Sequence, residues 1–209
     1  MKIAVVAANG KAGKQIVEEA VARGHEVTAV VRGENKTKAQ YQLIKDLYDL
    51  TTEDLNDFDV VVDAFGIFDP EKMEEHQTSL KHLADILSNT ATRLLVVGGA
   101  GSLYVDPEHT VELMNTPDFP EAFKPLASNM GKALAALKNR NDVNWTYISP
   151  AADFQADGEK TGKYSVAGEE LTLNSNGESV ISYADYAVAM VDEIENGKHI
   201  KERISVVKA

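Results

Sequence analysis

Apolar and polar residues follow one another along this chain in blocks that indicate alternating strands and helices. Short runs rich in apolar residues, typical of strands in a parallel sheet, lie at residues 3–7, 26–32, 42–47, 59–66, 93–99 and 145–149. Helical spacing follows the first run up to Gly24 and recurs at about residues 71–89 and 120–139. Strands that alternate with helices predict right-handed crossovers, so we expect a doubly wound α/β fold.

The C-terminal part departs from this rhythm. Residues 151–180 are rich in Gly, Asp, Ser and Asn, with short β-like pieces at 163–166 and 171–173. The capping box Ser182-x-x-Asp185 then predicts a helix that ends at Asn196-Gly197, and residues 204–207 predict a last strand. We expect one domain, residues 1–209, in which residues 151–181 and 182–209 form a small lobe over the carboxyl edge of the sheet, on the substrate side.

The first strand runs directly into the turn Ala7-Ala8-Asn9-Gly10-Lys11-Ala12-Gly13. A glycine turn between a strand and a helix presents the pyrophosphate of a dinucleotide to the helix N-terminus. Gly10 stands where the backbone approaches the phosphates and Gly13 where the helix packs closely on the strand, while the small Ala7 replaces the first glycine of the motif. Such glycines can also serve chain reversal alone, but the flanking strands and helix favour a Rossmann-type nucleotide site.

Arg32 ends the second strand about 20 residues after the glycine turn, at the position that contacts the adenosine ribose in such folds. A carboxylate there binds the ribose hydroxyls of NAD, whereas a cation binds the 2′-phosphate of NADP, and the guanidinium fork suits phosphate. Lys36 and Lys38 follow closely. We therefore predict a preference for NADP(H). The nearby Glu34 leaves NAD(H) as the alternative cofactor. The alternative for Arg32 is that it is only a solvated residue at the end of a strand.

Composition narrows the function classes. The chain has 209 residues, 44% of them hydrophobic, and no cysteine, which excludes disulfides and thiolate chemistry. The five histidines show no metal-ligand spacing, so we expect no obligate metal. A net charge of −12 without a basic stripe argues against nucleic-acid binding. No apolar run approaches the roughly 20 residues of a membrane span, and the chain starts directly on a strand, so we expect a cytoplasmic protein.

Several further segments carry a family resemblance that extends over essentially the whole chain. They are Val30–Arg32, Lys45–Asp49, Asp63–Gly66, Val96–Leu103 and Tyr183–Ala187, of which the run Val-Val-Gly-Gly-Ala-Gly-Ser-Leu is the most specific. With the glycine turn, they resemble the atypical short-chain dehydrogenase/reductases with NmrA-like and biliverdin-IXβ-reductase-like members. More narrowly, the chain resembles small bacterial proteins described as NADH-flavin reductases.

The resemblance implies a set of cofactor contacts. The amides of Asn9 to Ala12 would hold the pyrophosphate and Arg32 the 2′-phosphate. The other implied contacts are Asp46 and Leu47 at the adenine, Ala64, Phe65 and Gly66 at the riboses, and Gly99 to Ser102 with Pro150 and Ala151 at the nicotinamide. A solvated strand-end carboxylate is the alternative for Asp46, and a core aromatic is the alternative for Phe65.

One departure from the wider superfamily bears on the reaction. Its typical members carry Tyr-x-x-x-Lys, in which lysine prepares the phenol to exchange a proton with a carbonyl or alcohol; here Ser128 precedes Lys132 by four positions. Flavins and linear tetrapyrroles accept hydride on an electron-poor ring and can take the proton from water. The sequence therefore predicts an NAD(P)H-dependent reductase acting on a small planar acceptor such as a flavin, quinone or tetrapyrrole. A nucleotide-sugar epimerase is disfavoured.

Other residues are candidates for the substrate side. Ser102 is the candidate catalytic contact near the nicotinamide, with a turn-forming serine as the alternative. Lys132 would contact a ribose hydroxyl or remain solvated. Tyr104 and Phe154 would stack on the planar acceptor, and His109 would donate a proton, although lone loop histidines are seldom catalytic.

The alternative function is an NmrA-like redox sensor that binds the same cofactor with little turnover, because a fold alone does not set function. We expect a monomer or a homodimer.

Overall fold

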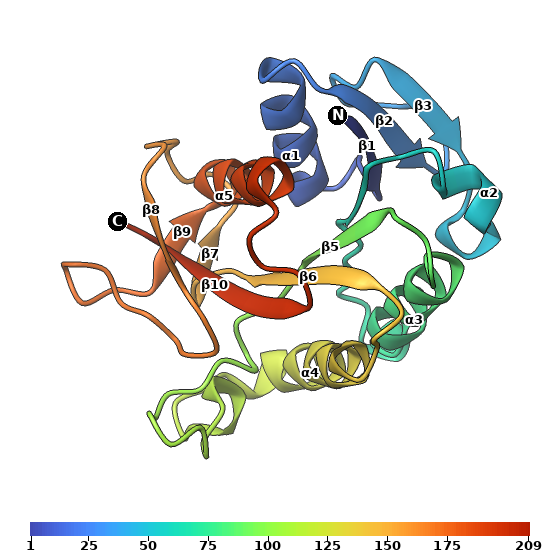
Figure 1. Cartoon of the computed structure of the whole chain (residues 1–209). Helices are drawn as coiled ribbons and strands as arrows, with labels where there is room; N and C mark the ends of the chain where they lie inside the picture. Colours follow the sequence, from blue (N-terminus) through green and yellow to red (C-terminus); the bar gives the residue numbers. More distant parts are fainter.

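A computed structural model describes all residues, Met1–Ala209, and shows one twisted sheet with helices on both faces (Figure 1). The eight strands lie in the order β3-β2-β1-β4-β5-β6-β10-β8, all parallel to their neighbours except β8, which pairs antiparallel with β10. In chain order the strands are β1 (Lys2–Val6), β2 (Glu26–Val31), β3 (Tyr41–Ile44), β4 (Val60–Asp63), β5 (Arg93–Val97), β6 (Asn144–Ser149), β8 (Tyr164–Ala167) and β10 (Glu202–Lys208). The predicted doubly wound α/β fold is confirmed.

Two helical layers cover the sheet. Helices α1 (Lys11–Ala22) and α5 (Tyr183–Asn196) pack together on one face, and α3 (Glu75–Ile86) and α4 (Lys124–Lys138) on the other, as Figure 1 shows. Successive side chains of β4 lie on opposite faces of the sheet and belong to two different buried clusters. Val60 and Val62 face α1 and α5, and Val61 faces α3 and α4. The remaining helical pieces are short: α2 (Thr52–Leu55) and the 3₁₀ turns Leu47–Asp49, Pro70–Lys72, Leu113–Asn115 and Glu121–Phe123.

Two predicted elements differ from the structure at their ends, and a third is absent. The third strand stops at Ile44, because Asp46 instead caps a 3₁₀ turn by accepting the Tyr48 N–H at 3.0 Å. The predicted helix over 71–89 begins only at Glu75, after a separate 3₁₀ turn, and ends at Ile86. The predicted β-piece at 171–173 is wrong, since that segment pairs with no strand.

The C-terminal segment divides between the layers. Residues 182–209, expected in the lobe, supply α5 to the helical layer and β10 to the sheet between β6 and β8. Within 151–181, β7 (Asp153–Gln155) forms a separate parallel pair with β9 (Val180–Ser182), close to β8 and β10 in Figure 1. The lobe is therefore smaller than expected, because long-range pairing of β10 with β6 draws the end of the chain into the sheet.

The N-terminus of α5 shows one half of the predicted capping box. The Ser182 hydroxyl accepts the Asp185 N–H at 3.0 Å. The Asp185 carboxylate does not reach back to complete the box. It instead accepts the N–H groups of Thr161 and Gly162 at 2.8 and 2.7 Å, which ties the loop before β8 to α5.

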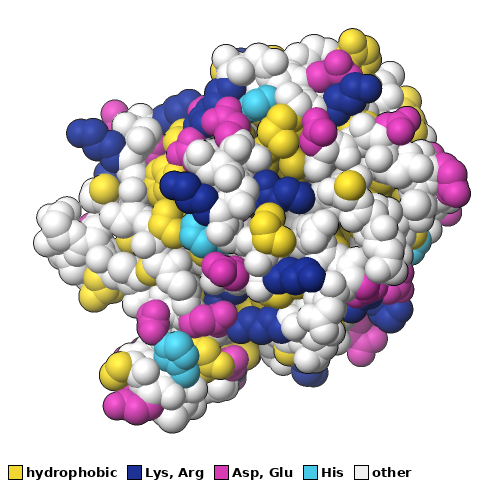
Figure 2. Space-filling model, viewed as in Figure 1, with side chains coloured by type: hydrophobic (Ala, Val, Ile, Leu, Met, Phe, Trp, Pro, Cys, Tyr) yellow, Lys and Arg dark blue, Asp and Glu magenta, His cyan; other side chains and the backbone are white.

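The surface carries charges of both signs. On the face shown in Figure 2, Lys and Arg side chains are interspersed with Asp and Glu, and no broad basic stripe crosses it. None of the helices combines the length and the apolar character that a membrane crossing requires.

Candidate functional site

The turn between β1 and α1 leaves the start of α1 open to an anion. Gly10 precedes the helix in extended conformation, no side chain caps it, and the first turn contains no acidic residue. The N–H groups of Lys11 and Ala12 find no acceptor within the protein. Unpaired amides and the helix dipole together favour a phosphate at this position.

Gly13 is the glycine that this turn cannot replace. A Cβ at position 13 would lie 2.8 Å from the Ala8 carbonyl oxygen and 2.9 Å from that of Ala7. Both neighbours are backbone atoms that cannot move aside. The close approach of α1 to β1 therefore depends on the missing side chain, as the sequence predicted.

Ala7 holds the left-handed conformation that the motif normally assigns to glycine, with φ at 57°. We expect Ala7→Gly to raise the free energy of unfolding by about 1 kcal/mol, because the left-handed penalty of an L-residue exceeds the added entropy of the unfolded chain. Urea unfolding measures this change. Ala8→Gly, at a fully buried alanine with φ outside that region, is the matched control and should destabilise. A loss of stability in both variants would contradict the prediction.

Asn9 joins the glycine turn to the loop after β2. Its amide donates to the Glu34 carbonyl at 2.9 Å and its carbonyl oxygen accepts the Lys36 N–H at 2.8 Å. This loop follows Arg32 directly. The Arg32 side chain is exposed and takes part in no ion pair, whereas Lys38 pairs with Glu18. Asn9 therefore ties the backbone of the loop after Arg32 to the glycine turn.

A cleft of about 810 Å³ opens at the carboxyl ends of the central strands and includes the start of α1. Its volume suits a cofactor-sized ligand. The structure brings twelve of the predicted site residues into its lining: Gly10, Lys11, Ala12, Ala64, Phe65, Gly66, Gly99, Ala100, Gly101, Pro150, Ala151 and Phe154. The other predicted residues do not line it: Ala7, Asn9, Gly13, Arg32, Asp46, Leu47, Ser102, Tyr104, His109 and Lys132.

The glycine run after β5 forms part of the cleft for a packing reason. A Cβ at Gly98 would lie only 2.2 Å from Cε1 of Tyr147, whose ring is fully enclosed in the core. The Tyr147 hydroxyl accepts the Gly99 N–H at 3.2 Å. Tyr147 therefore fixes the loop that edges the predicted nicotinamide position.

Helix α4 and the turn before it present an apolar wall to the cleft. The wall consists of Phe123, Leu126, Ala127 and Met130. Ser128 and Lys132 do not line the cleft, and Lys132 is exposed without a hydrogen-bond partner. Neither a phenol nor an ammonium group reaches the cleft from α4.

Aromatic residues that the sequence analysis missed complete the lining. Phe68 and Phe123 lie at the surface, 72% and 55% exposed. Tyr183 packs against Phe154 with ring centroids 4.0 Å apart. The only sequence signal for Tyr183 is its place in the segment Tyr183–Ala187, which contributed to the family resemblance.

Ser102 lies in a buried polar network instead of the cleft. It is 7% exposed, and its hydroxyl accepts from Nη1 of Arg203 at 3.2 Å. Arg203 also donates to the Ser102 carbonyl oxygen at 3.0 Å and to the carboxylate of Glu169 through Nε at 3.0 Å. This geometry fits a structural serine, because its hydroxyl accepts from Arg203 and the residue does not line the cleft.

Tyr104 and His109 lie outside the cleft. Their rings stack on each other with centroids 4.6 Å apart, and His109 bonds to Glu170 at 2.6 Å. The cause is backbone pairing of Tyr104 with the segment 169–171, which holds the loop against the C-terminal part of the chain. The prediction that these two side chains face the acceptor is therefore corrected.

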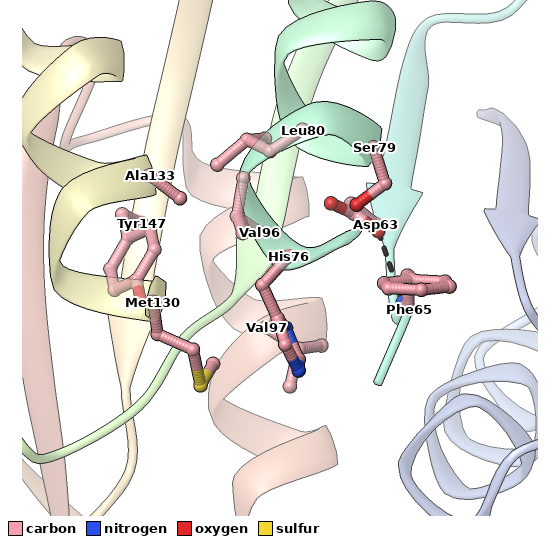
Figure 3. A pocket seen from close by; sticks show the side chains of 10 residues that line it. All are labelled: Asp63, Phe65, His76, Ser79, Leu80, Val96, Val97, Met130, Ala133 and Tyr147. Atoms are coloured by element: carbon pink, nitrogen blue, oxygen red, sulfur yellow. Dashed lines mark hydrogen bonds between the residues drawn. The ribbon is translucent and has the colours of Figure 1, made fainter. Parts of the chain in front are cut away.

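A smaller cavity of about 20 Å³ adjoins the cleft and shares Phe65, His76, Val97 and Met130 with it (Figure 3). Asp63 accepts the Phe65 N–H at 3.0 Å, and burial raises the pKa of its carboxyl group to about 6. The buried Ser79 hydroxyl has no partner and lies close to Asp63 in Figure 3. The volume is sufficient for one water molecule. Burial lowers the pKa of His76. Its Nε2 lies 2.9 Å from the Ile67 carbonyl oxygen and 3.4 Å from the Ile67 nitrogen; the shorter contact is to an atom that can only accept, which assigns the hydrogen to Nε2.

A parallel sheet with an open helix N-terminus at its carboxyl edge defines a dinucleotide-binding protein of the Rossmann type. The family model described as NAD(P)H-binding matches residues 7–196, and the chain belongs to that family. The resemblance to atypical short-chain dehydrogenase/reductases stated above is thereby confirmed.

Three bacterial proteins are similar to this chain over nearly its whole length. YwnB of Bacillus subtilis (strain 168), an uncharacterised protein, is 47% identical over 99% of this chain and 98% of its own. A crystal structure from Streptococcus pneumoniae TIGR4, with the provisional description NADH-flavin reductase, is 56% identical with a TM-score of 0.98 over 100% of both chains. A Bacteroides thetaiotaomicron structure provisionally described as an epimerase is 33% identical with a TM-score of 0.85, covering 99% of this chain and 96% of that one.

Proposed function

We propose that this protein is an NAD(P)H-dependent reductase that passes hydride to a planar conjugated acceptor, such as a flavin or a quinone. One observation carries the proposal. The same cleft joins an open helix N-terminus, suited to a pyrophosphate, to an aromatic region in which α4 supplies no acid or base.

The residues present fit a nicotinamide dinucleotide. The unpaired amides of Lys11 and Ala12 would bind the pyrophosphate, and the absence of a Cβ at Gly10 leaves room for its approach. Residues 64–66 and the Pro150–Ala151 turn would border the riboses and the nicotinamide. A bound dihydronicotinamide supplies the hydride, while the protein contributes binding, orientation and exclusion of water.

The lining of the cleft favours a planar acceptor over an alcohol or ketone. Six aromatic side chains contribute to it: Phe65, Phe68, Phe119, Phe123, Phe154 and Tyr183. Aromatic faces bind conjugated rings by stacking. An alcohol or ketone requires a proton exchange in the transition state, for which the α4 wall offers no group. The description of the Streptococcus pneumoniae relative supports a flavin acceptor, whereas the same wall does not favour epimerase chemistry.

We further propose that Arg32 selects NADP(H) by binding the 2′-phosphate. Arg32→Asp should weaken NADPH binding about 10- to 100-fold, because a charge-assisted hydrogen bond of about 1.5–3 kcal/mol is lost and replaced by repulsion. NADH binding should change little. Fluorescence titration of both cofactors measures the effect.

Lys38→Asp is the matched control for Arg32→Asp. It makes the same charge change in the same loop, at a side chain already paired with Glu18, and should affect NADPH binding much less. Equal weakening of NADPH and NADH in Arg32→Asp would remove Arg32 from this role.

The proposal is tested by NADPH and NADH oxidation with FMN, FAD, riboflavin and menadione, together with direct cofactor titration. We expect turnover with at least one of these acceptors. Tight cofactor binding without turnover would contradict the reductase and support the redox sensor instead. Failure to bind either cofactor would contradict both functions.

A further inference from the structure

The cleft contains few side chains that can donate a hydrogen bond to a ligand. Those with a hydrogen on nitrogen or oxygen are Lys11, His76, Thr116 and Tyr183. His76 donates to the Ile67 carbonyl, and the Thr116 hydroxyl donates to the Leu113 carbonyl at 2.8 Å. Lys11 begins α1, next to the amides proposed for the pyrophosphate. Tyr183 is thus the uncommitted donor away from the phosphate end of the cleft.

The ring of Tyr183 is held in place although its hydroxyl is free. Tyr183 is the first residue of α5, directly after the capping residue Ser182. Its ring lies against Phe154, which in turn lies 4.8 Å from the ring of Tyr186. The Tyr186 hydroxyl is fixed in the core by a 2.7 Å bond to the Ile148 carbonyl oxygen. Phe154 and Tyr183 therefore form an anchored aromatic pair that lines the cleft.

We propose that Tyr183 is a specificity-determining residue that selects acceptors with a hydrogen-bonding atom on the conjugated ring. The Phe154–Tyr183 pair would stack on the ring, and the Tyr183 hydroxyl would donate to a ring carbonyl or nitrogen, as in a quinone or an isoalloxazine. This inference rests on the proposed function and narrows its substrate class. The α4 wall supplies apolar contact only, and the carboxylates of Asp118 and Asp153 in the lining can only accept, so side-chain donation to the acceptor falls to Tyr183.

Tyr183 acts as a donor and not as a base. Burial raises the pKa of its phenol, so the hydroxyl keeps its proton at neutral pH. A donor aimed at an atom that gains negative charge stabilises reduction of the ring. In the overall step the dihydronicotinamide is oxidised by loss of hydride, the acceptor ring is reduced by gaining it, and water at the open cleft provides the matching proton. The Tyr183 hydroxyl keeps its own proton throughout.

Tyr183→Phe separates the hydroxyl from the ring, because it keeps the packing against Phe154. The first readout is the Kd of riboflavin for protein saturated with NADP⁺, measured from flavin fluorescence and independent of turnover. We expect binding about 3- to 10-fold weaker, the effect of one neutral hydrogen bond. The kcat/KM for riboflavin and menadione should fall by at least the same factor, while the Kd of NADPH stays unchanged.

Tyr41→Phe is the matched control, since Tyr41 is an exposed phenol on the edge strand β3, outside the cleft. It should leave riboflavin binding at the wild-type value. Tyr183→Ala, which removes the ring as well, should weaken riboflavin further than Tyr183→Phe. If Tyr183→Phe binds riboflavin as tightly as wild type and only Tyr183→Ala weakens it, the hydroxyl has no role and the inference is overturned.

Failure of the proposed function gives a different pattern. Wild-type protein that binds NADPH and riboflavin but shows no turnover contradicts the reductase, while the binding comparison between wild type and Tyr183→Phe still decides the role of Tyr183. Wild-type protein that binds neither riboflavin nor menadione overturns the assignment of Tyr183 directly.

Discussion

Replacement of Arg203 with methionine is expected to lower the free energy of unfolding by about 2–4 kcal/mol, because it removes the buried cation of an ion pair whose carboxylate is 28% exposed. Arg203 is 4% exposed and holds together three separated parts of the chain through Ser102, Ser149 and Glu169. Although burial opposes ionisation, Lys138 and Arg203 keep the pKa of Glu169 below its ordinary value. Without Arg203, the hydroxyls of Ser102 and Ser149 lose their donor, and Glu169 keeps only Lys138 as a cation. The midpoint of urea unfolding measures the change.

Two variants calibrate this prediction. Lys138→Met removes the other cation of Glu169, but at a side chain that is 39% exposed, and should cost less than about 1 kcal/mol. Ser102→Ala removes one acceptor of Arg203 and should cost about 1 kcal/mol without changing kcat, as expected of a structural serine. If Arg203→Met is no more destabilising than Lys138→Met, the network does not support the fold. A fall in kcat for Ser102→Ala with intact cofactor binding would return that residue to the active site.

Asp63→Asn is expected to stabilise the protein above pH 7 by about 3 kcal/mol. The folded protein raises the pKa of Asp63 from 3.8 to about 6, and each unit corresponds to about 1.4 kcal/mol. Because the folded pKa exceeds the unfolded one, the contribution of this group to stability is full below pH 4 and is lost as the pH rises through 6. Asparagine keeps an oxygen for the Phe65 N–H but carries no charge into the cavity.

The measurement is the difference in the free energy of unfolding between Asp63→Asn and wild type from pH 4 to pH 8, which cancels the titration of other groups. We expect a difference near zero at pH 4 that grows to about 3 kcal/mol at pH 8. Asp153→Asn, at an exposed carboxylate that lines the main cleft, is the matched control and should show no such rise. A difference for Asp63→Asn that does not vary with pH would contradict the buried, raised-pKa carboxyl.

The proposed cofactor end of the cleft could be predicted because it is built from one short stretch and from strand ends. The short stretch is the turn of residues 7–13. In it Ala7 adopts the left-handed φ of the missing glycine, and Gly13 allows the close contact of α1 with β1. Residues 64–66 and 150–151 follow directly after parallel strands, whose carboxyl ends meet at one edge. Local sequence therefore placed them together.

The proposed acceptor end of the cleft could not be predicted in the same way. Tyr104, His109 and Tyr183 are all polar aromatic residues in or beside loops, and only the first two were predicted to face the acceptor. Pairing of Tyr104 with the segment 169–171 turns its loop away, whereas packing against Phe154 holds Tyr183 at the cleft. Both contacts join residues far apart in the chain, so no local pattern reports them.

The sequence by itself determined the alternation of strands and helices, the parallel sheet and the open helix N-terminus, because hydrophobic periodicity and backbone freedom are local properties. Only the tertiary structure decided that β10 enters the sheet, that Ser102 supports Arg203, and that Tyr183 offers a free hydroxyl to the cleft. In each case the outcome depends on which residue, far away in the sequence, lies beside the backbone or side-chain group once it is buried. Only the complete fold sets these neighbours.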